Sequence, residues 1–440
     1  MIAPSVIADP GGEPRERPVR ALPVPSGPAV LGVLPALAEA LAGRGPVLRP
    51  CAAGAEGLVT DVTGLPDDPA DPLALVVGTS GSTGRSKAAM LPAAALRASA
   101  AATAAVLDAR SPAGDGVAEE RWVLALPGQH VAGLQVLLRS LRAGTEPAVV
   151  DLTHGFDVAS FVTAVESCGP GRLRTSLVPT QLVRLLAAMG ADPGPGVEPA
   201  RVLAALRRLD AVLVGAAATP PDLLERALAA GVAVVTTYGS SETCGGCVYD
   251  GLPLPGVGVD VERDGGDGGD GEGPGRLRIT GPVLARGYLA DPTASAAAFD
   301  HAPDGRRRFR TDDLADLGPD GRVRVVGRVD DLVVTGGVKV APGVVEAVLA
   351  RDPEVAEVVV VGVPDAEWGQ VVAACVVPAP GARPDLAGLR ARAAAGLPGH
   401  ALPRRLLLLD DLPLRGPGKP DRTRLVDLVI GNTAGRPDVM

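Results

Sequence analysis

The sequence predicts an α/β protein with a large N-terminal domain of parallel sheets covered by helices, a small β subdomain and a small α+β C-terminal domain. Three observations predict this architecture. Strand-like and helical segments alternate with short connections from residue 72 to residue 239, which is typical of parallel strands covered on both faces. A glycine- and aspartate-rich stretch, residues 262–275, then separates strand-like segments. A second helix–strand pattern begins at residue 341, and 440 residues exceed a typical single domain.

The elements follow one another as this fold requires. Residues 1–25 are rich in Pro, Gly and Arg, and we expect them to form a loose lead-in. A helix is expected at 33–45, a strand at 72–80 and an Ala- and Leu-rich helix at 91–109. Further strands are expected at 121–127, 146–151, 173–179, 211–216 and 232–239, and further helices at 132–144, 158–168, 180–189 and 221–231.

The last part of the chain has a different pattern. Residues 262–275 have the composition of a flexible, solvated hairpin loop. A strand, a turn and a strand are expected at 321–337, and a helix followed by a strand at 341–365. The pattern therefore predicts a separate α+β domain of about a hundred residues at the C-terminus.

Composition and charge exclude several classes of function. The formal net charge of −9 argues against a nucleic-acid-binding protein, whose surface would be basic. Five cysteines are too few for a disulfide framework in a chain of this length. No signal-peptide pattern is evident at the N-terminus, and Pro, Gly or charges interrupt every apolar run before the ~18 residues that a membrane span needs. We therefore expect a cytoplasmic protein without membrane insertion.

Lysine is rare in this sequence, which makes its positions informative. Only Lys87, Lys339 and Lys419 are lysines among the 42 basic residues. Each lies in or beside a glycine-rich segment. A compact ammonium reaches a phosphate oxygen where a planar guanidinium would not fit, so we expect at least two of these lysines to be functional.

The stretch GTSGSTGRSKAAM, residues 78–90, predicts a phosphate-binding loop. It follows an apolar strand and precedes the helix at 91–109. Backbone N–H groups in such a turn form an anion-binding nest, and its Ser and Thr hydroxyls add donors. Two residues separate Gly84 from Lys87, whereas the P-loop of nucleotide triphosphatases has its lysine directly after the glycine. The spacing therefore argues against a P-loop enzyme.

Three further segments carry candidate chemistry. In TTYGSSETCGG, residues 236–246, the carboxylate of Glu242 and the hydroxyl of Thr243 are candidates for binding Mg²⁺ and a phosphate oxygen. The pair Cys244 and Cys247 lacks a partner pair with zinc-ligand spacing, so we interpret it as packing in a tight loop. Carboxylates in residues 310–337 are suited to the hydroxyls of a ribose, and residues 413–422 surround Lys419 with Gly and Pro.

Together these segments resemble the adenylate-forming superfamily of acyl- and aryl-CoA synthetases, peptide-synthetase adenylation domains and luciferases. The resemblance rests on TSGSTGRSK (79–87), YGSSET (238–243), TDDL (311–314), GRVDD (327–331) and GPGKPDR (416–422). It departs from the superfamily at Ser86, where a proline is usual, and at Asp312, where a glycine is usual. These departures bear on loop rigidity and nucleotide affinity.

The resemblance implies a role for each segment. The domains would be residues 1–329 and a mobile domain of residues 331–440, with a hinge at Asp330. Lys419 would bridge the attacking carboxylate and the α-phosphate of ATP, Glu242 would carry Mg²⁺, Thr243 would contact the α-phosphate and His130 would gate the acyl pocket. The implied nucleotide-binding residues are Thr79, Ser80, Gly81, Ser82, Thr83, Gly84, Lys87, Gly215, Ala216, Ala217, Tyr238, Gly239, Asp313, Arg328 and Gly337.

The resemblance also narrows the substrate. Residues 126–141 and 176–186 look like those of the o-succinylbenzoate–CoA ligases of menaquinone biosynthesis, which implies ATP, Mg²⁺ and coenzyme A as cofactor and co-substrates. His130, Gln135, Thr180 and Gln181 are then candidate donors to the second carboxylate of the acid. A ligase for a different aryl or acyl acid and a non-catalytic nucleotide-binding relative are the alternatives, and a homodimer is left open.

Overall fold

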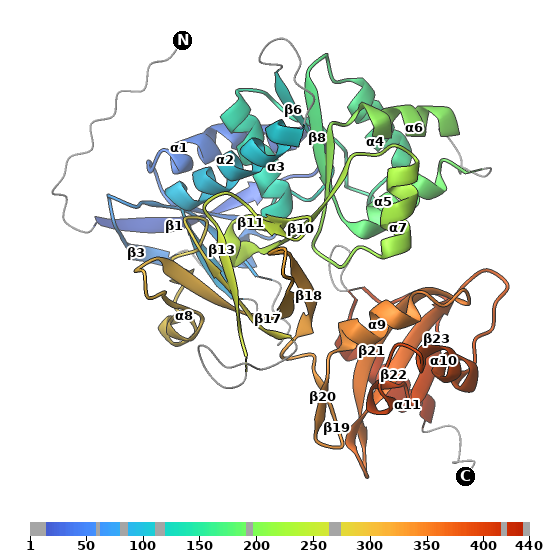
Figure 1. The fold of residues 1–440 in the computed structure, drawn as a ribbon. Coiled ribbons are helices and arrows are strands. Elements are labelled where there is room, and N and C mark those ends of the chain that lie inside the picture. Colours follow the sequence, from blue (N-terminus) through green and yellow to red (C-terminus); the bar gives the residue numbers. More distant parts are fainter. Residues whose placement is uncertain are drawn as a thin grey trace. The chain divides into compact units, whose positions relative to one another are not determined.

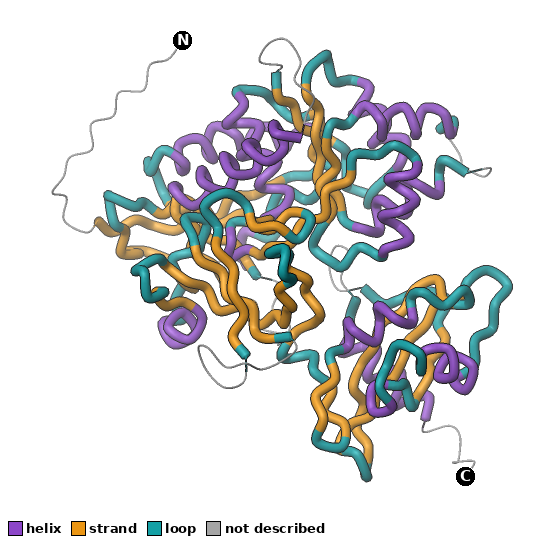
Figure 2. The backbone as a smooth tube through the Cα atoms, in the orientation of Figure 1, coloured by secondary structure: helices purple, strands orange, loops and turns teal. Residues whose placement is uncertain are grey.

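The computed structural model describes residues 15–58, 62–79, 87–110, 119–190, 197–263, 274–414 and 420–433. By its internal contacts the chain divides into two compact units, residues 1–259 with 279–310, and residues 260–278 with 311–440. Both units combine strands and helices (Figures 1 and 2). Among the helices described, none is both long and apolar enough to cross a membrane.

The first unit contains a mixed six-stranded sheet near its N-terminus. Its order is β15 (Gly287–Tyr288), β5 (Ala88–Pro92), β4 (Leu73–Gly78), β2 (Val47–Ala52), β1 (Arg15–Val24) and β3 (Val62–Asp67). The expected loose lead-in at residues 1–25 is therefore wrong for residues 15–24. Val19 is fully buried in β1, and Arg17 pairs with the buried Asp67 at 2.8 Å, so this Arg- and Pro-rich segment is held as a strand by burial and an ion pair.

The second sheet has seven strands and supplies the predicted parallel core. Strands β10 (Val234–Ser240), β9 (Ala211–Val214), β8 (Arg172–Leu177), β6 (Glu120–Leu124) and β7 (Ala148–Val149) are all parallel. The antiparallel strands β11 (Gly245–Tyr249) and β12 (Leu252–Pro253) extend one edge. The alternation of strands and helices thus predicted the direction of these strands correctly.

Helices bury both faces of this sheet (Figure 1). Trp122 and Leu124 of β6 pack with the helices of one face, and Val123 packs with those of the other. The first face is covered by α1 (Leu34–Leu41), α2 (Ala93–Arg110) and α3 (Val131–Ala143), which also pack on the six-stranded sheet. The second face is covered by α4 (Val158–Glu166), α5 (Pro179–Ala187), α6 (Pro199–Arg208) and α7 (Pro221–Ala229). Burial on both faces explains the apolar run of β9, AVLV, whereas β8 buries Arg174 and Thr175 as well.

A smaller sheet accounts for the predicted β subdomain. It consists of β13 (Gly258–Glu262), β14 (Gly275–Thr280), β17 (Arg307–Leu317), β16 (Phe299–His301) and β18 (Val323–Arg328), and α8 (Pro292–Ala298) precedes β16. The division of the chain into units falls within these strands. Most of the acidic stretch 262–275 lies outside the described residues.

The C-terminal region is the predicted α+β domain. Its sheet has the order β20 (Val338–Val340), β19 (Val333–Thr335), β22 (Gly369–Pro378) and β21 (Val355–Asp365), and β23 (Arg405–Leu408) pairs with β22. Helices α9 (Pro342–Leu349) and α10 (Leu386–Ala393) pack on one face of the β21–β22 ribbon, and α11 (Arg422–Thr433) packs on the other. Short 3₁₀ helices lie at Gly27–Val33, Glu56–Leu58, Ser241–Thr243 and Gly399–Ala401.

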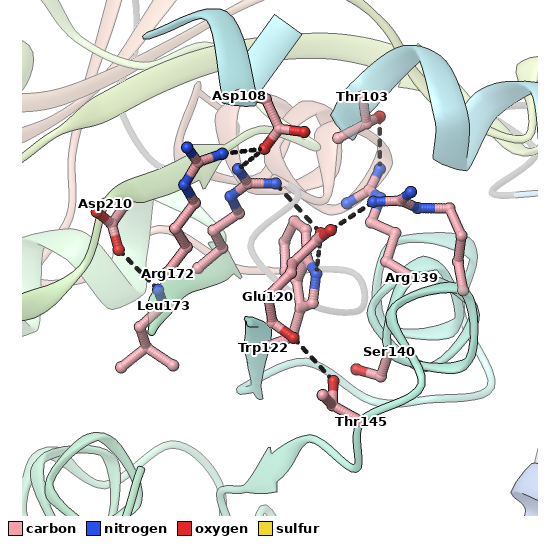
Figure 3. Close-up of polar contacts among 12 residues, drawn as sticks. Thr103, Asp108, Glu120, Trp122, Arg139, Ser140, Thr145, Arg172, Leu173 and Asp210 are labelled. Carbon is pink, nitrogen blue, oxygen red and sulfur yellow. Dashed lines mark hydrogen bonds and ion pairs between the residues drawn. The ribbon is translucent and has the colours of Figure 1, made fainter. Parts of the chain in front are cut away.

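A buried polar cluster joins α2, β6, α3 and β8 (Figure 3). Arg174 is fully buried and contacts Asp108 at 2.5 Å and Glu120 at 3.2 Å. Glu120 also accepts the indole N–H of Trp122 at 2.7 Å and pairs with Arg142. Burial by itself would raise the pKa of Asp108, but its hydrogen bonds to two arginines lower it below its ordinary value. These ion pairs around the buried Arg174 and Glu120 connect all four elements.

We expect Arg174→Ala to destabilise the protein by about 3 kcal/mol, because it leaves the largely buried Glu120 without one of its counter-charges. Chemical denaturation would measure the change. Arg201→Ala is the matched control, since Arg201 and Glu166 pair on the surface, where removal should cost less than about 1 kcal/mol. Equal effects of the two substitutions would contradict this interpretation.

Candidate active site

The candidate site lies where the parallel strands of the seven-stranded sheet end. Because β6, β8, β9 and β10 are parallel, the segments that follow them meet at one edge of the sheet. This edge brings together most of the predicted residues of the first unit. They are His130 after β6, Thr180 and Gln181 after β8, Gly215, Ala216 and Ala217 after β9, and Tyr238, Gly239, Glu242 and Thr243 at the end of β10.

The predicted phosphate loop joins two antiparallel strands. Gly78 at the end of β4 pairs with Ala88 at the start of β5, and the N–H of Thr79 donates to the carbonyl of Lys87 at 2.8 Å. The expectation that the loop leads directly into a helix is therefore wrong, because Ala88–Pro92 form a strand before α2 begins. An anion here would be bound by loop groups and not by a helix N-terminus. Residues Ser80, Gly81, Ser82, Thr83, Gly84 and Ser86 lie outside the described residues.

Ser241 connects the end of β10 with this loop. Its hydroxyl donates to the carbonyl of Gly78, the last residue of β4, at 3.0 Å. This hydrogen bond places the segment that carries Glu242 beside the residue at which the glycine-rich loop begins. Sequence reasoning did not select Ser241, although a hydroxyl directly before the candidate metal ligand is the signal that could have identified it.

Glu242 fits the role of a magnesium ligand. Its side chain is 8% exposed, and one carboxylate oxygen accepts the hydroxyl of Tyr288 at 2.9 Å. The carbonyl of Glu242 accepts the N–H of Ala285 at 2.8 Å, which fixes the backbone. Within the described ranges, no group of three or more His, Cys, Asp or Glu gathers. Mg²⁺ at nucleotide sites commonly uses one or two protein carboxylates together with phosphate oxygens and waters, so a single buried carboxylate is sufficient.

Thr243 stabilises the turn that carries Glu242. It is fully buried, and its hydroxyl donates to the carbonyl of Gly245 at 2.7 Å and accepts the N–H of Ser240 at 2.9 Å. To donate to an α-phosphate, this hydroxyl would have to leave the carbonyl of Gly245, just as the Ser241 hydroxyl would have to leave that of Gly78. Ser241 differs in that its partner is the last residue of β4, next to the glycine-rich loop. Cys244 and Cys247 are both fully buried, and burial raises the pKa of Cys244. The expected packing is thus confirmed, but only Cys244 lies in the turn, because Cys247 belongs to β11.

The turn after β9 packs closely against β10. A Cβ on Gly215 would lie 2.2 Å from the Thr237 hydroxyl oxygen, so only glycine fits between β9 and β10. Ala216 follows with a φ of 69°, an uncommon conformation for a residue with a side chain. Tyr238 is half-buried on β10, next to this turn.

The four candidate acid-binding residues differ in their burial and in their hydrogen-bond partners. Gln181 accepts the Val178 N–H at 3.0 Å and donates to the Ala125 carbonyl at 2.8 Å, so it holds α5 against β6. Gln135 is buried on α3 and donates to the carbonyl of Cys244 at 2.6 Å. His130 is exposed at the N-cap of α3, and Thr180 is half-buried in the first turn of α5. The amide groups of the two glutamines therefore serve the fold.

The second unit carries the predicted ribose residues. Asp313 of β17 is paired with Arg328 of β18, and their side chains contact at 3.1 Å. Arg328 also bonds to Asp330 at 2.9 Å and lies 3.7 Å from Asp312. Burial alone would lower the pKa of Arg328, but the hydrogen bond to Asp330 and the neighbouring carboxylates raise it. Asp312, which departs from the superfamily pattern, thus adds negative charge beside Arg328.

A second arginine contacts the segment that follows the predicted hinge. Arg422, the first residue of α11, lies 3.4 Å from Asp331 and 2.9 Å from Glu346. Burial raises the pKa of Asp331, and the charge of Arg422 offsets only part of this effect. Lys419 lies outside the described residues, three positions before Arg422. The division into compact units places Asp330 inside the second unit, so a hinge at this residue between domains 1–329 and 331–440 stays a prediction.

Gly336 and Gly337 form the tight turn between β19 and β20. Their φ values are 57° and 80°, as a two-residue hairpin turn of the primed type requires. A Cβ on Gly336 would lie 2.7 Å from the ring of Trp368. The predicted nucleotide-binding residue Gly337 is therefore at the tip of a hairpin that packs against an aromatic ring.

Comparison with known proteins assigns this arrangement to a family. The AMP-binding enzyme family matches residues 27–289, which is more than half of the chain, and its C-terminal domain matches residues 344–419. The chain belongs to the AMP-binding enzyme family. A probable 2-succinylbenzoate–CoA ligase of Mycobacterium tuberculosis H37Rv is 42% identical over 420 residues, covering 94% of this chain and 99% of that protein.

Solved structures of AMP-binding enzymes share the fold. The o-succinylbenzoate CoA synthetase of Bacillus subtilis in complex with its acyl-adenylate intermediate is similar with a TM-score of 0.66 and 25% identity, covering 86% of this chain and 74% of that chain. ATP-bound MatB of Rhodopseudomonas palustris is similar with a TM-score of 0.69 and 26% identity, covering 93% and 78%. The predicted α/β fold class and the resemblance to adenylate-forming enzymes are confirmed.

We expect Thr243→Val to lower the free energy of unfolding by about 2 kcal/mol, because it leaves a buried backbone N–H and a buried carbonyl without their shared partner. The KM for ATP should change little. Thermal unfolding and steady-state kinetics would measure the two quantities. Unchanged stability together with a several-fold higher KM for ATP would show instead that this hydroxyl faces the nucleotide.

Proposed function

We propose that this protein is an o-succinylbenzoate–CoA ligase of menaquinone biosynthesis. Such an enzyme uses ATP to adenylate o-succinylbenzoate and then transfers the acyl group to coenzyme A, releasing pyrophosphate and AMP. The observation that carries the proposal is the 42% identity to a probable 2-succinylbenzoate–CoA ligase over 94% of the chain. We also propose that it acts in the cytoplasm, where ATP and coenzyme A are supplied. A homodimer stays a prediction.

The first half-reaction joins two anions, so the site must neutralise charge and align the reacting atoms. Mg²⁺ bound with ATP would supply charge neutralisation at the phosphates, and Glu242 would hold it. Ser241 and the loop from Thr79 to Lys87 would orient the phosphates, because the Ser241–Gly78 hydrogen bond keeps these two segments together. The turn of Gly215, Ala216 and Ala217 would flank adenine at the edge of the sheet.

The second unit would contribute the ribose contacts and the catalytic lysine. We propose that Asp313 accepts hydrogen bonds from the ribose hydroxyls, because Arg328 fixes its carboxylate from the neighbouring strand. Lys419 would bridge the carboxylate of the acid and the α-phosphate. After adenylation the C-terminal domain would rotate about Asp330, which requires the Arg328–Asp330 contact to break. The hairpin tip with Gly337 would then replace Lys419 at the site.

The acid pocket would lie between α3 and the ends of β6 and β10. A substrate with a second carboxylate needs hydrogen-bond donors or positive charge. The amide groups of Gln135 and Gln181 already donate to backbone carbonyls. We therefore favour His130 and Thr180 as the side chains that contact the acid, with Gln135 shaping the floor of the pocket.

Turnover with a panel of acids tests the proposed function directly. We expect o-succinylbenzoate to release pyrophosphate and form a CoA thioester, whereas benzoate, which lacks the succinyl carboxylate, should react at least tenfold more slowly because a missing charge-assisted contact costs this much. Pyrophosphate release and thioester formation would be measured for each acid. If the protein turns over another acid, such as ferulate, and does not turn over o-succinylbenzoate, the proposed substrate is wrong and the proposed class of reaction stands.

Lys419→Ala tests whether Lys419 acts in adenylation and not in thioester formation. We expect adenylation to fall by about 100-fold or more, because one charge-assisted contact in the transition state is lost. Thioester formation from preformed acyl-adenylate should stay within a few-fold of wild type. The matched control is Lys339→Ala, since Lys339 is exposed on β20. Normal adenylation by the Lys419 variant would contradict the mechanism.

A further inference from the structure

Tyr288 lies between two residues that the proposed function uses separately. Its hydroxyl donates to one carboxylate oxygen of Glu242 at 2.9 Å. The ammonium nitrogen of Lys87 lies 4.8 Å from the centre of the same ring. Tyr288 is 5% exposed and belongs to β15, which pairs with β5 directly after Lys87. One buried side chain therefore contacts both the candidate metal ligand and the lysine of the phosphate loop.

The position of the Tyr288 ring is fixed by other aromatic residues. Phe299 packs edge-on against Tyr288 at 5.6 Å between ring centres, and Phe309 stacks on Phe299 at 5.0 Å. The whole chain has only nine aromatic residues, two Trp, three Tyr and four Phe. Three of the nine thus meet at this one place. Such a stack holds a ring rigidly, because a rotation of one ring would disturb the next.

We propose that Tyr288 is a positioning residue that couples magnesium binding at Glu242 to the placement of Lys87. This inference rests on the proposed function and adds a residue that the sequence patterns did not single out. The hydroxyl fixes the rotamer of the Glu242 carboxylate and occupies one oxygen, which leaves the other oxygen oriented for the metal. The face of the ring holds the Lys87 ammonium by a cation–π contact, which keeps it near the loop without requiring a second carboxylate.

Two parts of one rigid side chain therefore have separable effects. Loss of the hydroxyl should affect the metal, because a buried carboxylate without its donor is less well oriented. Loss of the ring should affect the nucleotide phosphates as well, because the ammonium of Lys87 loses its contact surface. A side chain that only filled space would change stability and leave both binding equilibria unaltered.

Tyr288→Phe isolates the hydroxyl, since it keeps the ring and its packing on Phe299. We expect the Mg²⁺ concentration for half-maximal ATP–pyrophosphate exchange to rise about tenfold, the effect of losing one hydrogen bond to a charged group. Calorimetric binding of ATP at several Mg²⁺ concentrations should show the same shift without turnover. Thioester formation from preformed acyl-adenylate should be unchanged.

Tyr249→Phe is the matched control. Tyr249 is another buried tyrosine of the same unit, and its hydroxyl bonds to that of Thr103 at 2.9 Å and accepts from Arg139. Figure 3 shows Thr103 and Arg139, and neither is among the candidate site residues. Tyr249→Phe removes two buried hydrogen bonds and Tyr288→Phe removes the one to Glu242, so we expect the fall in Tm to be at least as large for the Tyr249 variant. Only Tyr288→Phe should change the Mg²⁺ dependence, and equal Mg²⁺ dependence in the two variants would overturn the proposal.

A double-mutant cycle tests the second half of the coupling. Tyr288→Leu should weaken ATP binding more than Tyr288→Phe, and this additional loss should disappear in the Lys87→Ala background. If the losses in ATP binding from Tyr288→Leu and Lys87→Ala simply add, the link to Lys87 is overturned. If the Leu variant does not fold, the Mg²⁺ dependence of Tyr288→Phe alone decides whether the proposal stands. If the wild-type protein shows no exchange activity with any acid, but Tyr288→Phe still shifts the Mg²⁺ dependence of ATP binding, the proposed function is refuted and this inference stands. If the wild type shows exchange activity and Tyr288→Phe causes no shift, the proposed function stands and this inference is refuted.

Discussion

Burial of both faces of the parallel strands β6, β8, β9 and β10 is the constraint on which the rest of this structure depends. Helices cover the sheet on each side, so a polar side chain inside a strand is buried and needs a partner there, as Arg174 of β8 has in Asp108 and Glu120. Since parallel strands end at one edge, the polar segments of four strands meet there. The site is therefore a consequence of the way the sheet is covered.

The same burial decides which polar side chains serve the fold and which face a ligand. Inside the core, hydroxyl and amide groups must be satisfied locally, and Thr243, Gln135 and Gln181 are engaged by backbone partners. Glu242 is 8% exposed, its partner is a tyrosine hydroxyl, and among the described residues no arginine pairs with it. A carboxylate oriented in this way suits a metal ion, whereas Glu120, surrounded by arginines, is a structural charge.

The chain has only nine aromatic residues, and three of them pack together beside the candidate metal ligand. An aromatic side chain at such a place supplies rigidity and, in tyrosine, a polar tip. Tyr288 with Phe299 and Phe309 beside Lys87 and Glu242 shows this use. In the second unit, arginines take the role of fixing carboxylates, with Arg328 on Asp313 and Arg422 on Asp331.

The sequence by itself determined the fold class, the order of most elements from residue 72 onward and the family, because these follow from local periodicity and short motifs. It was wrong about β1 and about the element after the phosphate loop, and it did not select Ser241. These depend on partners distant in sequence: Asp67 for Arg17, the hairpin pairing of Gly78 with Ala88, and Gly78 for Ser241. Only the tertiary structure brings Tyr288 against Glu242, since 46 positions separate them and no local pattern records the contact.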